Sequence, residues 1–122
     1  MLAAFVAAKE AIDKDDLKLA AEKLTWAADN VANAELKATA LLRLARVQAS
    51  QSQYEQALAT LAKPMPEAFK AQLAEIQGDI YLAQGDKDKA RSAYQSALEA
   101  AEGNSNPMLQ IKLDDLAQKT TV

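Results

Sequence analysis

Pairs of small residues recur three times along this chain, with the two members of each pair twelve positions apart. The pairs are Ala8 with Ala20, Ala45 with Ala57, and Gly78 with Ala90. A larger apolar residue follows the second member of each pair by four positions: Leu24, Leu61 and Tyr94. A small residue lets one helix approach another closely, and a larger one fills the gap between successive helix pairs. The spacing therefore predicts three helical hairpins, each stacked on the next.

The composition favours helices along the whole chain. Of the 122 residues, 28 are Ala and 16 are Leu, whereas Gly and Pro number only 3 each. Ala and Leu have high helix propensity, and no segment alternates apolar and polar residues as a half-buried strand would. We therefore expect an all-α fold whose core consists mainly of small side chains.

Turn-forming residues divide the chain into helical segments. We expect helices at residues 2–12, 15–28, 34–49, 53–62, 67–84, 87–101 and 107–118. Asp16, Asp86 and Asn106 stand where a side chain can cap a helix, and Pro66 and Pro107 suit the first helical position. The hairpins would cover residues of about 1–30, 34–63 and 66–102 in a single domain over 1–122, with a capping helix at 106–119.

The last predicted helix has the features of a cap on the third hairpin. An array of stacked hairpins needs cover for the apolar face of its last member. We expect Leu109, Leu113 and Leu116 to point inward and Lys112, Asp114, Asp115 and Lys119 to point outward.

The residue types argue against catalysis. The chain has no His and no Cys, so it has neither a side chain that titrates near neutral pH nor a thiolate. Adjacent carboxylates such as Asp114 and Asp115 point about 100° apart on a helix and do not converge on one ion or substrate. We therefore expect no enzymatic activity, no cofactor and no metal.

Charge and hydropathy limit the classes of partner. The formal net charge is −3 and the basic residues are dispersed, whereas binding to nucleic acid requires a clustered basic surface. The longest apolar run, residues 2–8, falls well short of the roughly 20 residues that cross a bilayer. We expect this sequence itself to be soluble, with no membrane contact and no nucleic acid, which leaves protein partners.

Stacked hairpins of this kind have a concave face built from the first helix of each pair. We expect the following residues to line it and to bind a partner: Phe5, Lys9, Leu42, Arg46, Gln72, Glu75, Asp79 and Leu82. Apolar members would contact a helix or extended segment, and charged members would set its orientation. Phe5, Leu42 and Leu82 are equally consistent with a place in the core. Trp26 and Phe69 are also open to two interpretations, either packing within the fold or exposed anchors for a partner.

The third unit resembles the tetratricopeptide repeat. The Gly, Tyr, Ala, aromatic and Ala positions of that motif are occupied by Gly78, Tyr81, Ala90, Tyr94 and Ala97. The first two units keep the spacing but have Ala8 and Ala45 in place of the Gly. The resemblance implies a tetratricopeptide-like solenoid of three helical hairpins plus a C-terminal capping helix. The alternative is an ordinary Ala-rich bundle, which has no reason to repeat the twelve-residue spacing.

Longer strings carry a more specific resemblance. They are ELKA at 35–38, LRLARVQ at 42–48, QGDK at 84–87 and MLQIKLDDL at 108–116. Together they are similar to the periplasmic domain of YfgM-like proteins, the ancillary subunits of the SecYEG translocon. The resemblance implies a non-enzymatic interaction module at the periplasmic face of the bacterial inner membrane, with SecYEG and the chaperone PpiD as partners in protein export. It also implies an N-terminal transmembrane anchor in the intact protein.

The residues permit a second function from a different class. The chain would then be a scaffold or oligomerisation domain whose concave face meets another copy of itself. A monomer at all concentrations that still captures PpiD would favour the interaction module, whereas a stable dimer through the concave face would favour the scaffold.

Overall fold

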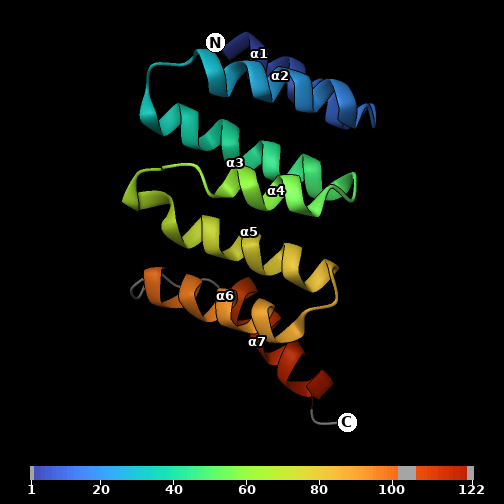
Figure 1. The fold of residues 1–122 in the computed structure, drawn as a ribbon, viewed down its shortest axis with the longest axis vertical. Coiled ribbons are helices and arrows are strands. Elements are labelled where there is room, and N and C mark those ends of the chain that lie inside the picture. The colour runs from blue at the N-terminus through green and yellow to red at the C-terminus, as the bar shows by residue number, and fades with distance from the viewer. Residues whose placement is uncertain (1, 102–106, 121–122) are drawn as a thin grey trace. The chain divides into compact units, whose positions relative to one another are not determined.

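The computed structural model describes residues 2–101 and 107–120, with side chains over 3–101 and 107–116 (Figure 1). This part of the chain forms seven α-helices and one short 3₁₀ helix, and it contains no strand. The helices are α1 (Leu2–Asp13), α2 (Leu17–Asn30), α3 (Ala34–Ser50), α4 (Tyr54–Leu61), η1 (Glu67–Phe69), α5 (Lys70–Ala83), α6 (Lys87–Ala101) and α7 (Pro107–Thr120). The predicted all-α class is confirmed. Across the described ranges, no helix combines the length and the apolar character that spanning a membrane requires.

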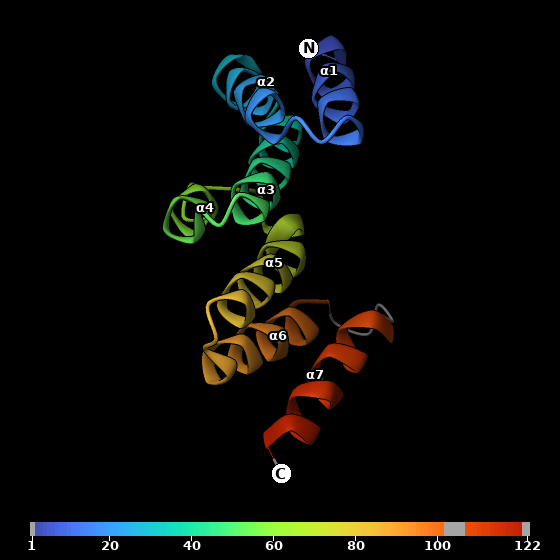
Figure 2. The same cartoon turned by 90° about the vertical axis from the view of Figure 1, so that its right-hand side faces the viewer.

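The chain divides into two compact units, residues 1–67 and 68–122. In the first unit, α2 packs against both α1 and α3, and α3 packs against α4 (Figures 1 and 2). In the second unit, α6 packs against both α5 and α7. Each unit has its own hydrophobic core. That the two units act as one domain over 1–122 stays a prediction.

The small residues that recur at the twelve-residue spacing are all buried. At most 2% of the surface is exposed for Ala8, Ala20, Ala45, Ala57 and Ala90, and Gly78 is also buried. The two members of each pair lie on helices that pack against each other, namely α1 with α2, α3 with α4, and α5 with α6. The larger residues of the pattern are at most 2% exposed as well: Leu24, Leu61 and Tyr94. The pattern therefore identified buried positions within packed helix pairs.

Gly78 of α5 lies in close contact with Tyr94 of α6. A Cβ atom added to Gly78 would lie 2.5 Å from Cε1 of Tyr94 and 2.6 Å from its Cδ1. Real carbon contacts are about 3.5–4.0 Å, so any side chain at this position must displace the Tyr94 ring or its helix. The absence of a side chain at Gly78 makes room for the Tyr94 ring, which is completely buried.

Side-chain caps fix the starts of three helices. Asp16 Oδ1 accepts a hydrogen bond from the backbone N–H of Leu19 at 3.1 Å, and Asp86 Oδ1 accepts one from Lys89 at 3.1 Å. Both caps were predicted. Asn33 Oδ1 accepts from the N–H groups of two residues, Glu35 at 2.9 Å and Leu36 at 3.1 Å, and this cap was not predicted. A side-chain acceptor here satisfies N–H groups that have no partner within the helix.

Three predicted helix starts were wrong, the start at residue 53 by one position because α4 begins at Tyr54, and one predicted cap lies outside the described residues. The second helix begins at Leu17 and not at residue 15, because Asp15 has φ of 61°, which lies outside the right-handed helical region. Pro66 does not occupy the first position of an α-helix, since Glu67–Phe69 form a 3₁₀ turn and α5 begins at Lys70. The proposed cap Asn106 falls in the part of the chain that is not described.

Replacing Asn33 by Ala should lower the free energy of unfolding by about 1 kcal/mol, because two N–H groups at the start of α3 lose their acceptor. Ser50→Ala is a matched control, since the Ser50 hydroxyl donates only to the carbonyl of Arg46 in its own helix. This control should change stability by less than about 0.5 kcal/mol. Urea denaturation followed by circular dichroism measures both, and equal losses would contradict the capping role of Asn33.

Candidate functional site

The residues expected on the concave face lie on α1, α3 and α5, four in each unit. Lys9, Arg46 and Gln72 are exposed, whereas Glu75, Asp79 and Leu82 are half-buried. Phe5 and Leu42 are buried, with 8% and 5% of their surfaces exposed. Lys9 and Arg46 are the exposed charged residues of this set in the first unit. Binding of a partner by this set stays a prediction.

Phe5 and Leu82 contribute to the cores, which favours the core interpretation left open for them. Phe5 packs in the core of the first unit, and the guanidinium carbon of Arg43 lies 5.2 Å from the centre of its ring. Leu82 packs against the core of the second unit. Aromatic burial with a cation over the ring is a stabilising arrangement that keeps Phe5 in place.

Glu75 and Asp79 of α5 bind the ammonium group of Lys112, which comes from α7. Lys112 Nζ lies 2.9 Å from Glu75 Oε2 and 3.0 Å from Asp79 Oδ1. It also lies 5.6 Å from the centre of the Tyr94 ring, and the Tyr94 hydroxyl donates a hydrogen bond to Asp79. The prediction that Lys112 points outward was wrong, because two carboxylates on the neighbouring helix offer charge-assisted hydrogen bonds.

The protonation states in this cluster follow from burial and charge. Burial raises the pKa of Tyr94 above its usual range, and the hydrogen bond to Asp79 and the nearby carboxylates raise it further. The phenol therefore stays protonated and continues to donate. Burial by itself would lower the pKa of Lys112, but the hydrogen bonds to Glu75 and Asp79 and their negative charges outweigh burial and raise that pKa. Lys112 therefore carries its charge at neutral pH.

The remaining residues of α7 largely agree with its predicted role as a cap. Leu109 and Leu116 are each 1% exposed and Leu113 packs partly against the same core, so the inward prediction is confirmed. Asp114 and Asp115 are exposed as predicted, whereas the side chain of Lys119 lies outside the described residues. Two apolar residues on the outer side of α7 are more than half exposed, Met108 at 58% and Ile111 at 59%.

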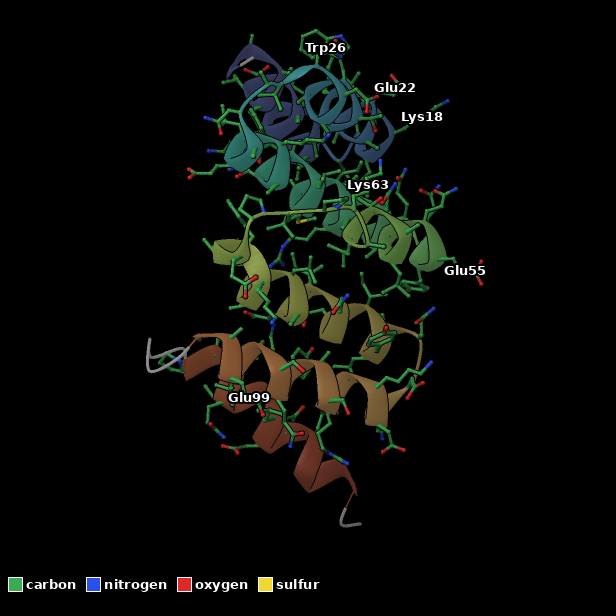
Figure 3. All side chains as sticks on the ribbon, turned by 60° about the vertical axis from the view of Figure 1, so that its left-hand side comes forward. Lys18, Glu22, Trp26, Glu55, Lys63 and Glu99 are labelled. Atoms are coloured by element: carbon green, nitrogen blue, oxygen red, sulfur yellow. The ribbon has the colours of Figure 1, made fainter. Side chains whose placement is uncertain are left out.

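Trp26 is exposed, which decides between its two interpretations. Its exposed fraction is 53%, and it lies on α2 four residues beyond Glu22 and eight beyond Lys18. Figure 3 shows these three side chains along one side of the helix. The Asn30 side chain donates to the carbonyl of Trp26 at 2.8 Å, which satisfies a backbone group near the end of α2. An exposed Trp of this kind is available to a partner.

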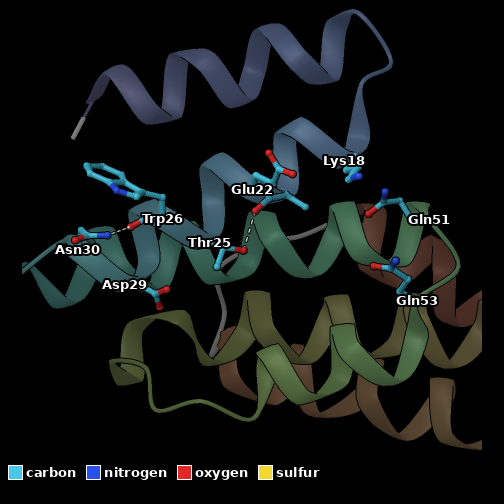
Figure 4. A pocket seen from close by; sticks show the side chains of 9 residues that line it. Lys18, Glu22, Thr25, Trp26, Asp29, Asn30, Gln51 and Gln53 are labelled. Atoms are coloured by element: carbon cyan, nitrogen blue, oxygen red, sulfur yellow. Dashed lines mark hydrogen bonds between the residues drawn. The ribbon is translucent and has the colours of Figure 1, made fainter.

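Two surface hollows of the first unit meet at Trp26. One measures about 620 Å³ and is lined by polar groups that include Thr25, Gln51 and Gln53 (Figure 4). Figure 4 shows Trp26 and Asn30 at one end of this hollow and Lys18 at the other. The second hollow, of about 540 Å³, lies between α1 and α2 and is lined by Ala3, Ala4, Ala7, Glu22, Lys23 and Trp26. Trp26 thus lines both hollows, and Glu22 is the other residue that they share.

Comparison with known proteins gives one family and several relatives. Residues 1–118 match the family described as tetratricopeptide repeat-like domain. The chain is 34% identical over 117 residues to the ancillary SecYEG translocon subunit of Escherichia coli K12, which covers 95% of this chain and 57% of that protein. It is 34% identical over 116 residues to the protein of the same name from Aggregatibacter actinomycetemcomitans, a match that covers 95% of this chain and 57% of that protein. The protein of the same name from Haemophilus influenzae is 33% identical over 109 residues, a match that covers 89% of this chain and 53% of that protein. The chain thus spans little more than half the length of these relatives.

Proposed function

The chain belongs to the tetratricopeptide repeat-like family, and from this membership we propose that it is a non-enzymatic protein-interaction module that serves the SecYEG translocon as an ancillary component. The observation that carries the proposal is the 34% identity over 95% of this chain to a protein named for that role. A translocon is an assembly of proteins, so the chemistry required of an ancillary component is recognition of other polypeptides. The exposed indole and the two hollows beside it supply surfaces for such recognition.

The proposal includes a location and a second partner. The module lies at the periplasmic face of the bacterial inner membrane, where an anchor in the intact protein holds it beside the translocon. There it works with the chaperone PpiD in protein export. This part is supported by the similarity of the strings at 42–48 and 108–116 to YfgM-like proteins.

The first unit supplies the proposed contacts from Trp26, Lys9 and Arg46. Trp contributes a large contact area and is enriched among the residues that dominate binding energy. The alanine-lined hollow offers an apolar wall to a partner side chain, and Gln51 and Gln53 offer amides to a partner backbone. Lys9 and Arg46 are exposed and basic, so they set the orientation of an acidic segment. Gln72 adds an exposed polar group on the second unit.

Replacing Trp26 by Ala should weaken capture of the chain on SecYEG proteoliposomes at least tenfold, since a central Trp typically contributes about 2 kcal/mol or more to binding. Its exposed side chain adds little to folding, so the melting temperature should stay within about 2 °C. Glu55→Ala is the control, because Glu55 projects from α4 (Figure 3) and is exposed. Unchanged capture of Trp26→Ala would remove Trp26 from the interface, and no capture of the intact, membrane-anchored protein would contradict the function.

A self-associating scaffold is the second candidate. The exposed apolar pair on α7, Met108 and Ile111, favours it, because such residues gain from being covered by another surface. Light scattering separates the two candidates. We expect a monomer at every concentration that still captures PpiD and SecYEG, whereas a stable dimer that captures neither would establish the scaffold.

A further inference from the structure

One face of α7 carries a lysine between two leucines. Leu109, Lys112 and Leu116 are spaced by three and four residues, so their side chains lie on the same side of the helix. The two leucines are each 1% exposed and pack in the core of the second unit, and the lysine between them binds the carboxylates of α5. The surface under α7 therefore holds a helix by an apolar contact, a cation and a second apolar contact.

The groups that bind the cation belong to α5 and α6, and one of them, Asp79, is held by a contact that does not involve α7. Glu75 and Asp79 are four residues apart on α5, so both carboxylates face the same side. Tyr94 of α6 fixes Asp79 through its hydroxyl, and its ring is packed closely against Gly78. We call the surface formed by Glu75, Asp79 and Tyr94 the lysine seat. Two carboxylates beside an aromatic ring are complementary to an ammonium group.

The helix that fills the lysine seat is enclosed on one side only. Met108 and Ile111, which lie outside this row on α7, are 58% and 59% exposed. The contacts of Leu109, Lys112 and Leu116 come from one row of residues, with Leu113 beside it, and a second helix with the same row reproduces the two leucine contacts and the ion pair. Charge complementarity specifies that helix, because two carboxylates require a cation between the apolar positions.

We propose that the lysine seat is a binding site for an amphipathic helix of a partner protein that carries Lys three residues after one apolar residue and four before the next. The partner helix enters in exchange with α7, which occupies the site in the free chain. This inference rests on the proposed function and assigns that function a second contact surface.

Because α7 occupies the lysine seat, a partner helix can bind only when α7 has left it. A tethered helix competes at a high effective concentration, so the affinity for a partner is reduced by the fraction of molecules in which the seat is free. Any change that loosens α7 without altering the seat must therefore strengthen binding of the partner helix. Lys112 is the residue to change, because it contributes to the α7 side of the contact alone.

Fluorescence anisotropy with a labelled peptide of residues 107–120 tests the proposal on the full chain. We expect the peptide to bind the Lys112→Met chain about tenfold more tightly than the unmodified chain. Within the Lys112→Met chain, the further changes Glu75→Gln and Asp79→Asn should remove this gain. A peptide that itself carries Lys112→Met should bind the Lys112→Met chain without this gain in affinity.

Matched variants separate exchange from a general loosening of the fold. Lys87→Met removes another exposed lysine of the second unit and should leave peptide affinity unchanged, and Lys112→Arg, which keeps the charge, should remain near the unmodified chain. Circular dichroism establishes that each variant is folded.

Equal peptide affinity for the Lys112→Met and unmodified chains, or tight binding of the lysine-free peptide, would overturn the proposal. So would a dimer formed by exchange of α7 between copies. If SecYEG capture persists in any of these cases, the proposed function stands and the lysine seat alone is rejected.

Discussion

Truncation after Gly103 is expected to lower the free energy of unfolding of the second unit by about 3–6 kcal/mol, at about 1.5–3 kcal/mol for each of two buried leucines. Leu109 and Leu116 are each 1% exposed and lie in one core with Tyr94. Removal of α7 exposes that core to water and also removes the ammonium group that pairs with Glu75 and Asp79. Urea denaturation followed by far-ultraviolet circular dichroism measures the loss.

The control for this truncation keeps α7 and removes only its exposed apolar side chains. Met108→Ala together with Ile111→Ala should change the free energy of unfolding by less than about 1 kcal/mol, because both residues are more than half exposed. The first unit should keep its stability in both variants, since its core contains no residue of α7. An unchanged melting temperature after truncation would show that α7 does not cover the core.

Gly78→Leu is expected to give the second large effect, a loss of about 3 kcal/mol, at the upper end of the range for overpacked cores. The first added atom already falls 2.5 Å from the Tyr94 ring. The ring cannot move aside easily, because its hydroxyl donates to Asp79 and the Lys112 ammonium group lies 5.6 Å from its centre. The cause is therefore steric and local to the contact between α5 and α6.

Two further variants identify the clash as the cause. Gly78→Ala raises helix propensity by about 1 kcal/mol, so a loss of stability in this variant must come from the contact with Tyr94. Ala83→Leu adds the same side chain as Gly78→Leu at an exposed position of α5 and should change stability by less than about 0.5 kcal/mol. A fully stable Gly78→Leu chain would contradict the close approach of the two helices.

The architecture was predictable because its signals are local and repeated. Small residues twelve positions apart identified Ala20, Ala57 and Ala90, all of them now found buried on packed helix pairs. Three recurrences of the same spacing pointed to hairpins of one kind, and the match to the tetratricopeptide repeat-like family over residues 1–118 confirms that fold. The resemblance to ancillary SecYEG translocon subunits is confirmed by the three relatives of that name described above.

Lys112 shows where reasoning from local pattern fails. A charged residue on an amphipathic helix was assigned to the water side, although its spacing from Leu109 and Leu116 places it on the buried face. Its partners, Asp79 and Glu75, lie 33 and 37 residues earlier in the chain. Contacts over such separations depend on how the helices pack together. The residue pattern of one helix does not show which residues of another helix it will contact.

Trp26 shows a different limit. Helical spacing places Trp26 off the row formed by Ala20, Leu24 and Ala27, all of which are buried. Packing against a later hairpin and exposure to solvent both satisfy that condition. Only the position of the neighbouring helices decides between them, and they leave Trp26 53% exposed beside two hollows.

Photocrosslinking in membranes tests most directly the claim that this chain is an interaction module of the translocon. A photoreactive residue placed at position 26 or 46 of the intact membrane-anchored protein samples the Trp26 surface and the exposed charge on α3, and position 55 on α4 serves as the control. We predict adducts with SecYEG subunits or PpiD from positions 26 and 46, and none from position 55. Adducts only with other copies of the chain, or equal labelling from all three positions, would contradict the claim.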